Sequence, residues 1–272
     1  MGPPGRLAPC LVVMRSPRSI CSAQGWPPLC RPSPSPREQR EDPWSWSGDS
    51  RCSAGSPALT GQPLDLDTVS RLEEGQTGQL ELLVAAGATL SGPSGVQLPT
   101  ALGPVQIDVL QVADGDFDPL PDDPTDRLHV LSHAWAADTA TLMTLMADAP
   151  PPVDVLVAQP AALVAMKLQS AMNRGAAKEG TDFLDIVRLS TDPVTNRPVV
   201  DGLQSAGQQL KDDALLHVGR WFEKGRDRTL KRIRTIPEGG ATTMDDLDLV
   251  AELLTAALGL LKRVVGDGPS RE

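Results

Sequence analysis

Three aspartates stand in two short alternating runs of the sequence. Asp65 and Asp67 flank a leucine in "LDLDTV", so on a β-strand both carboxylates point to the same face. Asp108 stands between two aliphatic residues in "VQIDVLQV", where an unpaired buried carboxylate would be costly. Carboxylates from two adjacent strands are suited to one or two Mg²⁺ ions, which prefer oxygen ligands. The alternative is that Asp65 and Asp67 are loop acids and that Asp108 lies at a strand edge.

A second charged pattern lies in "LVAMKLQSAMNRGAAKEGTDFLDIVRL". Five of its charged residues are spaced by seven, four, four and three positions: Lys167, Arg174, Lys178, Asp182 and Asp185. On one helix all five fall near a single stripe, which is either a solvated ladder of ion pairs or one wall of a polar site. Asp182 and Asp185 are expected to orient the basic residues, because they lie within ion-pair reach of them.

A third pattern is the basic stretch "GRWFEKGRDRTLKRIRTI". Four of its residues are expected to share one helix face: Arg220, Lys224, Arg228 and Lys231. With Trp221 or Phe222 exposed for stacking on a base, this face would bind RNA. The alternative is a solvated helix surface with Trp221 packed inward, because Glu223 and Asp227 interrupt the positive charge.

The elements that must position these residues follow from the hydrophobic pattern. Alternation predicts a strand at 64–69, a hairpin over 96–112 and a strand at 152–158, with a helix over 76–88 that stops at Gly87. After these come helical periods at 160–174, 178–190, 201–218, 221–235 and 243–265. Thr243 is the expected N-cap of the last helix.

The composition divides the chain near residue 59. Residues 1–58 are rich in Pro, Arg and Ser and contain all four cysteines, none at metal-ligand spacing. This segment is expected to be disordered, or to be an off-frame product of GC-rich DNA. The strands with an interspersed helix predict an α+β domain over 59–158, and the later periods predict a helical domain over 159–266.

The net charge of −10 argues against wholesale coating of nucleic acid or anionic membrane, although a local basic patch can still bind phosphate. No apolar run approaches the roughly 20 residues that span a bilayer, and "LAPCLVVM" is too short for a secretory signal, so we expect a cytoplasmic protein without membrane contact. His129, His133 and His217 have no partner at catalytic spacing and are expected to be structural.

The order of these motifs resembles the AbiEii/AbiGii-type nucleotidyltransferases, a group that includes the toxins of type IV toxin–antitoxin pairs and many bacterial relatives. In that family a Gly-Ser or Gly-Gly turn precedes D-x-D, a third Asp follows on a neighbouring strand, and a helix reads roughly K-L-x-A-x-x-x-R-x-x-x-K-x-x-x-D-x-x-D. Here that helix is "KLQSAMNRGAAKEGTDFLD", and the resemblance covers about residues 55–190. It implies that the α+β domain has a nucleotidyltransferase-like mixed sheet.

The resemblance implies Mg²⁺-dependent transfer of a nucleoside monophosphate from an NTP to an acceptor such as tRNA or a protein, and an antitoxin protein as a further partner. It assigns the metal ligands and a catalytic lysine to Asp65, Asp67, Asp108 and Lys167. It assigns the nucleotide contacts to Gly55, Ser56, Lys167, Arg174, Lys178 and Asp182. Basic groups on one stripe neutralise charge that develops on a transferred nucleotidyl group.

The sequence departs from the family at the phosphate-binding turn. Gly55 and Ser56 follow "WSWSGDSRCSA", which has no strand pattern, and only eight residues separate Ser56 from Asp65. If residues 1–58 are off-frame, the chain lacks both a core strand and this turn. The alternative function is therefore a catalytically inactive relative or truncated product that acts at most as a binding module.

Overall fold

The computed structural model describes residues 11–14, 30–32, 65–72, 74–100, 103–145, 152–172 and 175–259. The chain is a mixed α/β protein that divides into two compact units. Unit 1 contains the described residues up to Thr68 together with Gln79–Val109 and Thr141–Val157. Unit 2 contains Val69–Gly78, Leu110–Ala140 and the described residues from Ala158 onward.

The described strands form one mixed sheet in the order β2-β7-β8-β1-β3-β6-β5-β4. β1 pairs with β8 in parallel, whereas the pairs β2–β7, β7–β8, β4–β5 and β5–β6 are antiparallel. The strand bounds are β1 Leu11–Met14, β2 Cys30–Pro32, β3 Asp65–Leu72, β4 Thr89–Leu90, β5 Gly95–Leu98, β6 Val105–Ala113, β7 Thr141–Leu145 and β8 Val153–Val157.

The core of unit 1 lies between helix α1 (Gln79–Ala85) and the neighbouring strands. Val96 of β5 and Ile107 and Val109 of β6 are buried in it. The predicted hairpin is confirmed, because β5 and β6 pair antiparallel with Gly95 opposite Asp108. This pairing fixes which side chains of β6 face the core.

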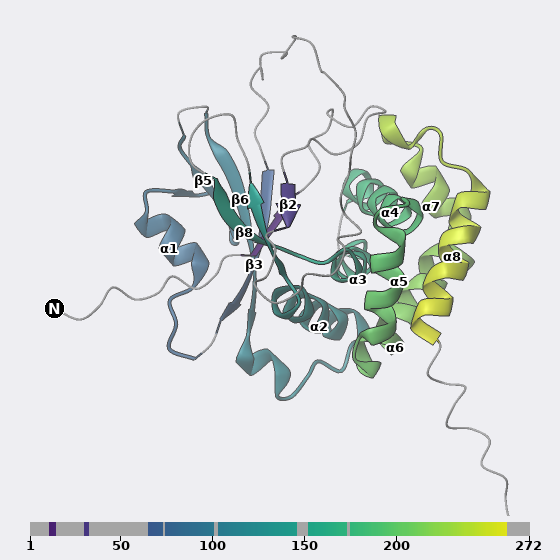
Figure 1. The fold of residues 1–272 in the computed structure, drawn as a ribbon, viewed down its shortest axis with the longest axis horizontal. Coiled ribbons are helices and arrows are strands. Elements are labelled where there is room, and N and C mark those ends of the chain that lie inside the picture. The colour runs from purple at the N-terminus through teal and green to yellow at the C-terminus, as the bar shows by residue number, and fades with distance from the viewer. Residues whose placement is uncertain are drawn as a thin grey trace, which may run out of the picture. The chain divides into compact units, whose positions relative to one another are not determined.

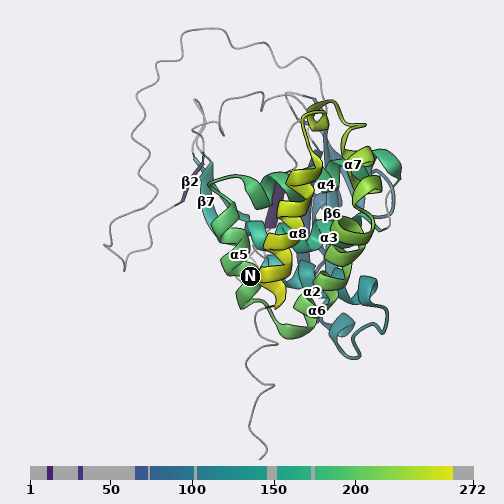
Figure 2. The ribbon, with the colours of Figure 1, turned by 90° about the vertical axis from the view of Figure 1, so that its right-hand side faces the viewer.

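Unit 2 is a group of helices that pack against one another (Figure 1), and Figure 2 shows the same group with α8 towards the viewer. Its core is aromatic and aliphatic, with Phe183, Phe222 and Leu168 fully buried. The helix bounds are α2 Pro124–Asp138, α3 Pro160–Ser170, α4 Ala176–Thr191, α5 Asn196–Ser205, α6 Gln208–Val218, α7 Arg226–Ile233 and α8 Met244–Gly259. Shorter turns are η1 Asp114–Phe117, the π-helical η2 Gly219–Lys224, and η3 Pro237–Gly239. No helix among the described residues is long and apolar enough to cross a membrane.

Two helices predicted to be continuous are divided in the structure. The period over 201–218 forms α5 and α6, because the chain is extended at Ala206 and Gly207. The period over 221–235 forms η2 and α7, which meet at Gly225. A Cβ at Gly225 would lie 2.5 Å from the Arg220 carbonyl oxygen, so this junction requires glycine.

The charged stripe is also divided, between α3 and α4. Helix α3 ends at Ser170 and α4 begins at Ala176, with Gly175 as its N-cap. Lys167 therefore lies on a different helix from Lys178 and Asp182. A single continuous stripe is wrong, whereas the separate periods at 160–174 and 178–190 are confirmed as separate helices.

Helix α2 is the main element that the hydrophobic pattern did not predict. Its N-terminus carries two standard signals, since Asp123 accepts hydrogen bonds from the Thr125 and Asp126 backbone N–H groups and Pro124 occupies the first turn. The helix packs against α3 and α6 within unit 2. Residues 110–140 therefore belong with the helices, and a boundary between the units lies between Val157 and Ala158, one residue before the division at 158/159 that the sequence predicts.

Within residues 1–58 only β1 and β2 are described, and the rest of the segment predicted to be disordered or off-frame lies outside the described residues. Strands β4 and β7 were not predicted. The N-cap prediction for α8 is confirmed, because the Thr243 backbone N–H donates to Asp246 Oδ2 at 2.8 Å and the Asp246 N–H donates back to Thr243 Oγ1 at 3.2 Å.

Candidate functional site: carboxylates of unit 1 and ion pairs of unit 2

Two aspartates of the predicted metal site lie on one face of neighbouring strands. Leu66 of β3 and Ile107 and Val109 of β6 belong to the core of unit 1. Because side chains alternate along a strand, Asp67 and Asp108 point to the opposite face. Strands β3 and β6 are adjacent in the sheet, and Asp67 is buried while Asp108 is half-buried.

Asp108 is held through both its backbone and its side chain. Thr68 Oγ1 on β3 donates to the Asp108 carbonyl oxygen at 3.3 Å. Gln106 Nε2, two residues earlier on β6, donates to Asp108 Oδ1 at 2.9 Å. Within the described part of the chain, Asp108 Oδ2 accepts no hydrogen bond. One carboxylate oxygen is thus engaged and the other is available to a ligand.

The remaining unit 1 predictions fall partly outside the described residues. Asp65 is the first residue of β3, but its side chain is not described, and Gly55 and Ser56 lie outside the described residues altogether. Among side chains that are described, no group of three or more His, Cys, Asp or Glu residues is placed to hold a metal ion. Of the three predicted metal ligands, Asp67 and Asp108 are the two whose side chains the structure describes.

Lys167 is the centre of a polar cluster between α3 and α4. Its Nζ lies 2.6 Å from Asp185 Oδ2 and 3.4 Å from Asp182 Oδ1. Ser170 Oγ, one turn after Lys167, donates to Asp182 Oδ2 at 2.9 Å. The Asp182 side chain is only 4% exposed, so these contacts stabilise a charge that burial alone would disfavour. The expected pairing of the two aspartates with the basic residues is confirmed for Lys167.

The two other basic residues of the motif differ from Lys167. Lys178 is exposed in the first turn of α4 and forms no ion pair with a described residue. Arg174 lies outside the described residues. The contact of these two residues with a triphosphate stays a prediction.

A second ionic cluster, which the sequence analysis did not include, centres on Glu179 in α4. Its side chain is 2% exposed and receives Arg228 Nη2 at 2.6 Å and an Arg232 Nε contact at 3.1 Å, both from α7. Gly180 allows this close approach of the two helices, because a Cβ there would lie 2.5 Å from the Arg232 carbonyl oxygen. The i, i+4 spacing of the two arginines is the sequence signal that marks them as neighbours on one helix face.

The predicted RNA surface keeps its basic residues but lacks an exposed aromatic ring. The four basic residues are exposed: Arg220, Lys224, Arg228 and Lys231. Trp221 and Phe222 are both buried, and Trp221 Nε1 donates to the Leu168 carbonyl oxygen at 3.3 Å. Arg220 and Arg228 lie over the Trp221 ring at 5.1 and 5.6 Å from its centroid. Trp221 therefore packs inward, as the alternative predicts, and the predicted stacking of a base on an exposed Trp221 or Phe222 is wrong.

Three polar groups of unit 2 have structural partners that explain their positions. His133 Nδ1 contacts the His129 carbonyl oxygen at 2.7 Å, and His217 Nδ1 contacts that of Asp213 at 2.8 Å, each four residues earlier on its own helix. Arg127 of α2 forms two hydrogen bonds with the buried carboxylate of Asp213 in α6, at 2.7 and 2.8 Å. The Asp213 carboxylate raises the pKa of Arg127 above its ordinary value.

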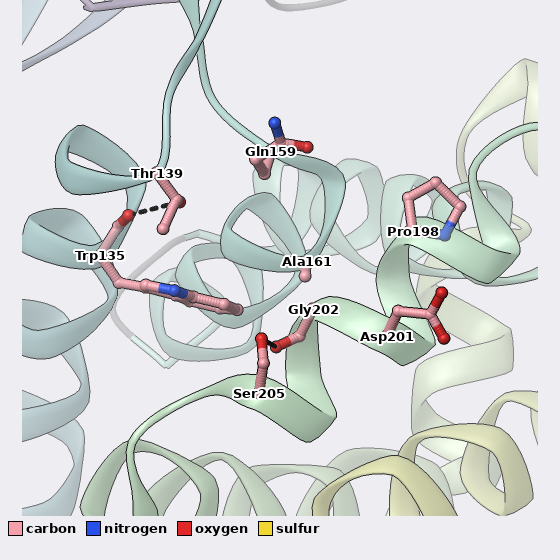
Figure 3. Close-up of a pocket in the computed structure, with 8 residues that line it drawn as sticks. All are labelled: Trp135, Thr139, Gln159, Ala161, Pro198, Asp201, Gly202 and Ser205. Atoms are coloured by element: carbon pink, nitrogen blue, oxygen red, sulfur yellow. Dashed lines mark hydrogen bonds between the residues drawn. The ribbon is translucent and has the colours of Figure 1, made fainter. Parts of the chain in front are cut away.

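A shallow pocket of about 390 Å³ lies in unit 2 (Figure 3). Its lining residues are Trp135, Thr139, Gln159, Ala161, Pro198, Asp201, Gly202 and Ser205. Thr139 Oγ1 donates to the Trp135 carbonyl oxygen, Ser205 Oγ donates to that of Gly202, and Asp201 pairs with Arg197. None of the predicted site residues lines this pocket, and its polar rim already has partners within the chain.

Comparisons with protein-family models, with curated proteins and with solved structures found no match.

Proposed function

We propose that this protein transfers a nucleoside monophosphate from an NTP to an acceptor in a Mg²⁺-dependent reaction. The observation that carries the proposal is the shared face of Asp67 and Asp108 on the neighbouring strands β3 and β6. Two carboxylates on one face of neighbouring strands are chemically suited to a hard divalent cation, and Oδ2 of Asp108 accepts no hydrogen bond from a described residue. The resemblance of the motif order to nucleotidyltransferases supplies the reaction class.

In the proposed reaction an acceptor hydroxyl attacks the α-phosphorus of the NTP. A new phosphorus–oxygen bond forms to the acceptor, the bond between the α-phosphorus and the α,β-bridging oxygen breaks, pyrophosphate leaves, and the hydroxyl proton passes to solvent. Bound Mg²⁺ would neutralise negative charge on the transferred group and on pyrophosphate. Asp67 and Asp108 would hold the cation, with Asp65 as the third ligand that the D-x-D spacing predicts.

The basic residues of unit 2 have separate proposed roles. Lys167 contributes positive charge for the phosphates, and Asp182 and Asp185 fix the position of its ammonium group. Lys178 is exposed and forms no ion pair with a described residue, so it is the better candidate for direct phosphate contact. Arg174 retains the phosphate-binding role that the motif predicts.

We propose an RNA acceptor that contacts the exposed basic residues of η2 and α7 through its phosphates. These are Arg220, Lys224, Arg228 and Lys231. Because Trp221 and Phe222 are buried, this contact would be electrostatic, without base stacking, and therefore sensitive to salt.

A second candidate, a non-catalytic binding module, is favoured by the ion pairs of Lys167. Its ammonium group is already held by two carboxylates, so its charge is largely neutralised within the chain before any phosphate binds. A relative that keeps the fold without catalysis would retain these pairs for stability alone.

The test is incubation of the purified full chain with Mg²⁺, each α-labelled NTP in turn and total RNA. Label transferred by the wild type and lost in Asp67→Asn, but kept in the matched control Asp154→Asn, supports the proposal. Asp154 is an exposed aspartate of β8 whose partner is Thr144. If a folded wild type transfers no label to any acceptor, the non-catalytic candidate replaces the first.

A further inference from the structure

The face of the sheet that holds Asp108 contains a second polar residue with a defined orientation. Gln106 and Asp108 are two positions apart on β6, so both side chains point away from the core that contains Ile107. Gln106 Nε2 donates to Asp108 Oδ1 at 2.9 Å. Both residues are half-buried, which limits exchange of this hydrogen bond with water.

Gly95 on β5 provides the space that this pair occupies. It is the register partner of Asp108 and is buried. A Cβ at position 95 would lie 2.6 Å from Gln106 Nε2, 2.8 Å from Asp108 Oδ1 and 2.8 Å from the Ser91 carbonyl oxygen. Gly95 is not among the residues with positive φ, so glycine is required here for space and not for backbone conformation.

The hydrogen bond has a direct consequence for the carboxylate. Because Oδ1 accepts from Gln106, rotation of the carboxylate is restricted and Oδ2 keeps one direction. The backbone of the same residue is tied to β3 by Thr68, next to Asp67. Hydrogen bonds of this kind orient a metal-ligating carboxylate and commonly change metal affinity by about 10- to 100-fold when removed.

We infer that Gln106 is the positioning residue of the proposed metal site and that Gly95 is the space-making residue on which its hydrogen bond depends. The inference rests on the proposed function, because it concerns the Mg²⁺ that Asp67 and Asp108 would hold. It assigns Asp108 Oδ2 as the oxygen that faces the cation, and it places Gln106 one step behind, in contact with the ligand and not with the metal.

The experiment measures Mn²⁺ binding to the full chain by electron paramagnetic resonance of the free ion, without NTP or acceptor. Four variants are compared with the wild type: Asp108→Asn, Gln106→Met, Gln97→Met and Gly95→Ala. Met matches Gln in length but cannot donate, and Gln97 is an exposed glutamine on β5 in register with Gln106. Circular dichroism and the urea midpoint confirm that each variant is folded.

The inference predicts that Asp108→Asn abolishes Mn²⁺ binding, that Gln106→Met and Gly95→Ala weaken it by about 10- to 100-fold, and that Gln97→Met leaves it unchanged. A merely structural role would change the urea midpoint of Gln106→Met without changing its Mn²⁺ affinity. If Asp108→Asn loses the ion and Gln106→Met binds like the wild type, the positioning role is overturned and the proposed function stands. If the folded wild type binds no Mn²⁺, the metal site fails and this inference fails with it.

Discussion

Lys167 Nζ donates to Asp185 Oδ2 at 2.6 Å across the break between α3 and α4. The pair joins the end of one helix to the middle of the next. Asp182 Oδ1 is a second partner of the same ammonium group, at 3.4 Å. Because the Asp182 side chain is almost fully buried, its charge depends on partners such as this ammonium group and the Ser170 hydroxyl, which donates at 2.9 Å.

We therefore expect Lys167→Met to lower the free energy of unfolding by about 3 kcal/mol, since it removes an ammonium group that pairs with two carboxylates, one of them buried. The measurement is urea unfolding followed by circular dichroism. Arg197→Met is the matched control, because its ion pair with Asp201 has side chains 88% and 63% exposed and should contribute at most about 0.5 kcal/mol. Equal effects of the two substitutions would contradict the structural role of Lys167.

The Arg127–Asp213 pair allows a test with two substitutions. Arg127→Met alone leaves the buried Asp213 carboxylate without its main partner and should cost about 3–5 kcal/mol. Asp213→Leu added to it removes the isolated charge, so the double variant should be more stable than Arg127→Met. Thermal unfolding of both variants checks the order. A double variant less stable than the single one would show that packing, and not charge, dominates at this position.

The N-cap of α2 should make stability depend on pH in the acid range. Hydrogen bonds from the Thr125 and Asp126 backbone N–H groups lower the pKa of Asp123 below its ordinary value. A group whose pKa is lower in the folded state stabilises the fold above its unfolded pKa and loses that contribution as the pH falls through the folded value. The contribution of Asp123 should therefore disappear as the pH falls below about 4.

Asp123→Ser separates the charge from the cap, because serine also accepts the hydrogen bonds but does not titrate in this range. The unfolding midpoint of this variant should approach that of the wild type as the pH falls from 6 to 3. Asp122→Ser, at the exposed neighbouring position, should follow the wild type throughout. A constant difference between wild type and Asp123→Ser across this range would refute the assignment.

Gly180→Ala tests the close approach of α4 and α7. The new Cβ would meet the Arg232 carbonyl oxygen at 2.5 Å, so the helices must separate, at a cost of about 1–3 kcal/mol. Gly259→Ala, at the last residue of α8, is the control, because a Cβ there would meet nothing within 4 Å. Differential scanning calorimetry of both variants is the measurement, and similar midpoints for the two would count against tight packing at Gly180.

The carboxylate face could be predicted from the sequence because strands have a period of two. The alternation around Asp67 and Asp108 gives both the strand and the facing of each side chain, and the hairpin signal near Gly103 joins β5 to β6. The role of Gly95 could not be predicted in this way, since it depends on the register between two strands.

The helical unit was harder to predict because charge spacing does not show where a helix ends. The residues from Lys167 to Asp185 match one helical stripe, yet the chain turns near Gly175 and the ion pairs form between two helices. Helix α2 was missed since its buried face includes Ser132 and His133 and gives a weak hydrophobic period. Its Asp123-Pro124 start was the better signal.

The Glu179 cluster has a consequence for any ligand that binds the basic surface. Arg228 is 58% exposed and reachable from solvent, but its guanidinium group already has a carboxylate partner. A phosphate that binds Arg228 must therefore compete with the Glu179 carboxylate. When the phosphate is bound, the buried Glu179 carboxylate keeps Arg232 as its described partner. By thermodynamic linkage, a nucleic acid that binds Arg228 would weaken the ion pair between α7 and α4, and this ion pair would in turn lower the affinity for the nucleic acid. Only Arg220, Lys224 and Lys231 would then contact phosphates without first losing a carboxylate partner. The logarithm of the RNA affinity should therefore fall less steeply with the logarithm of the salt concentration than four phosphate contacts would predict.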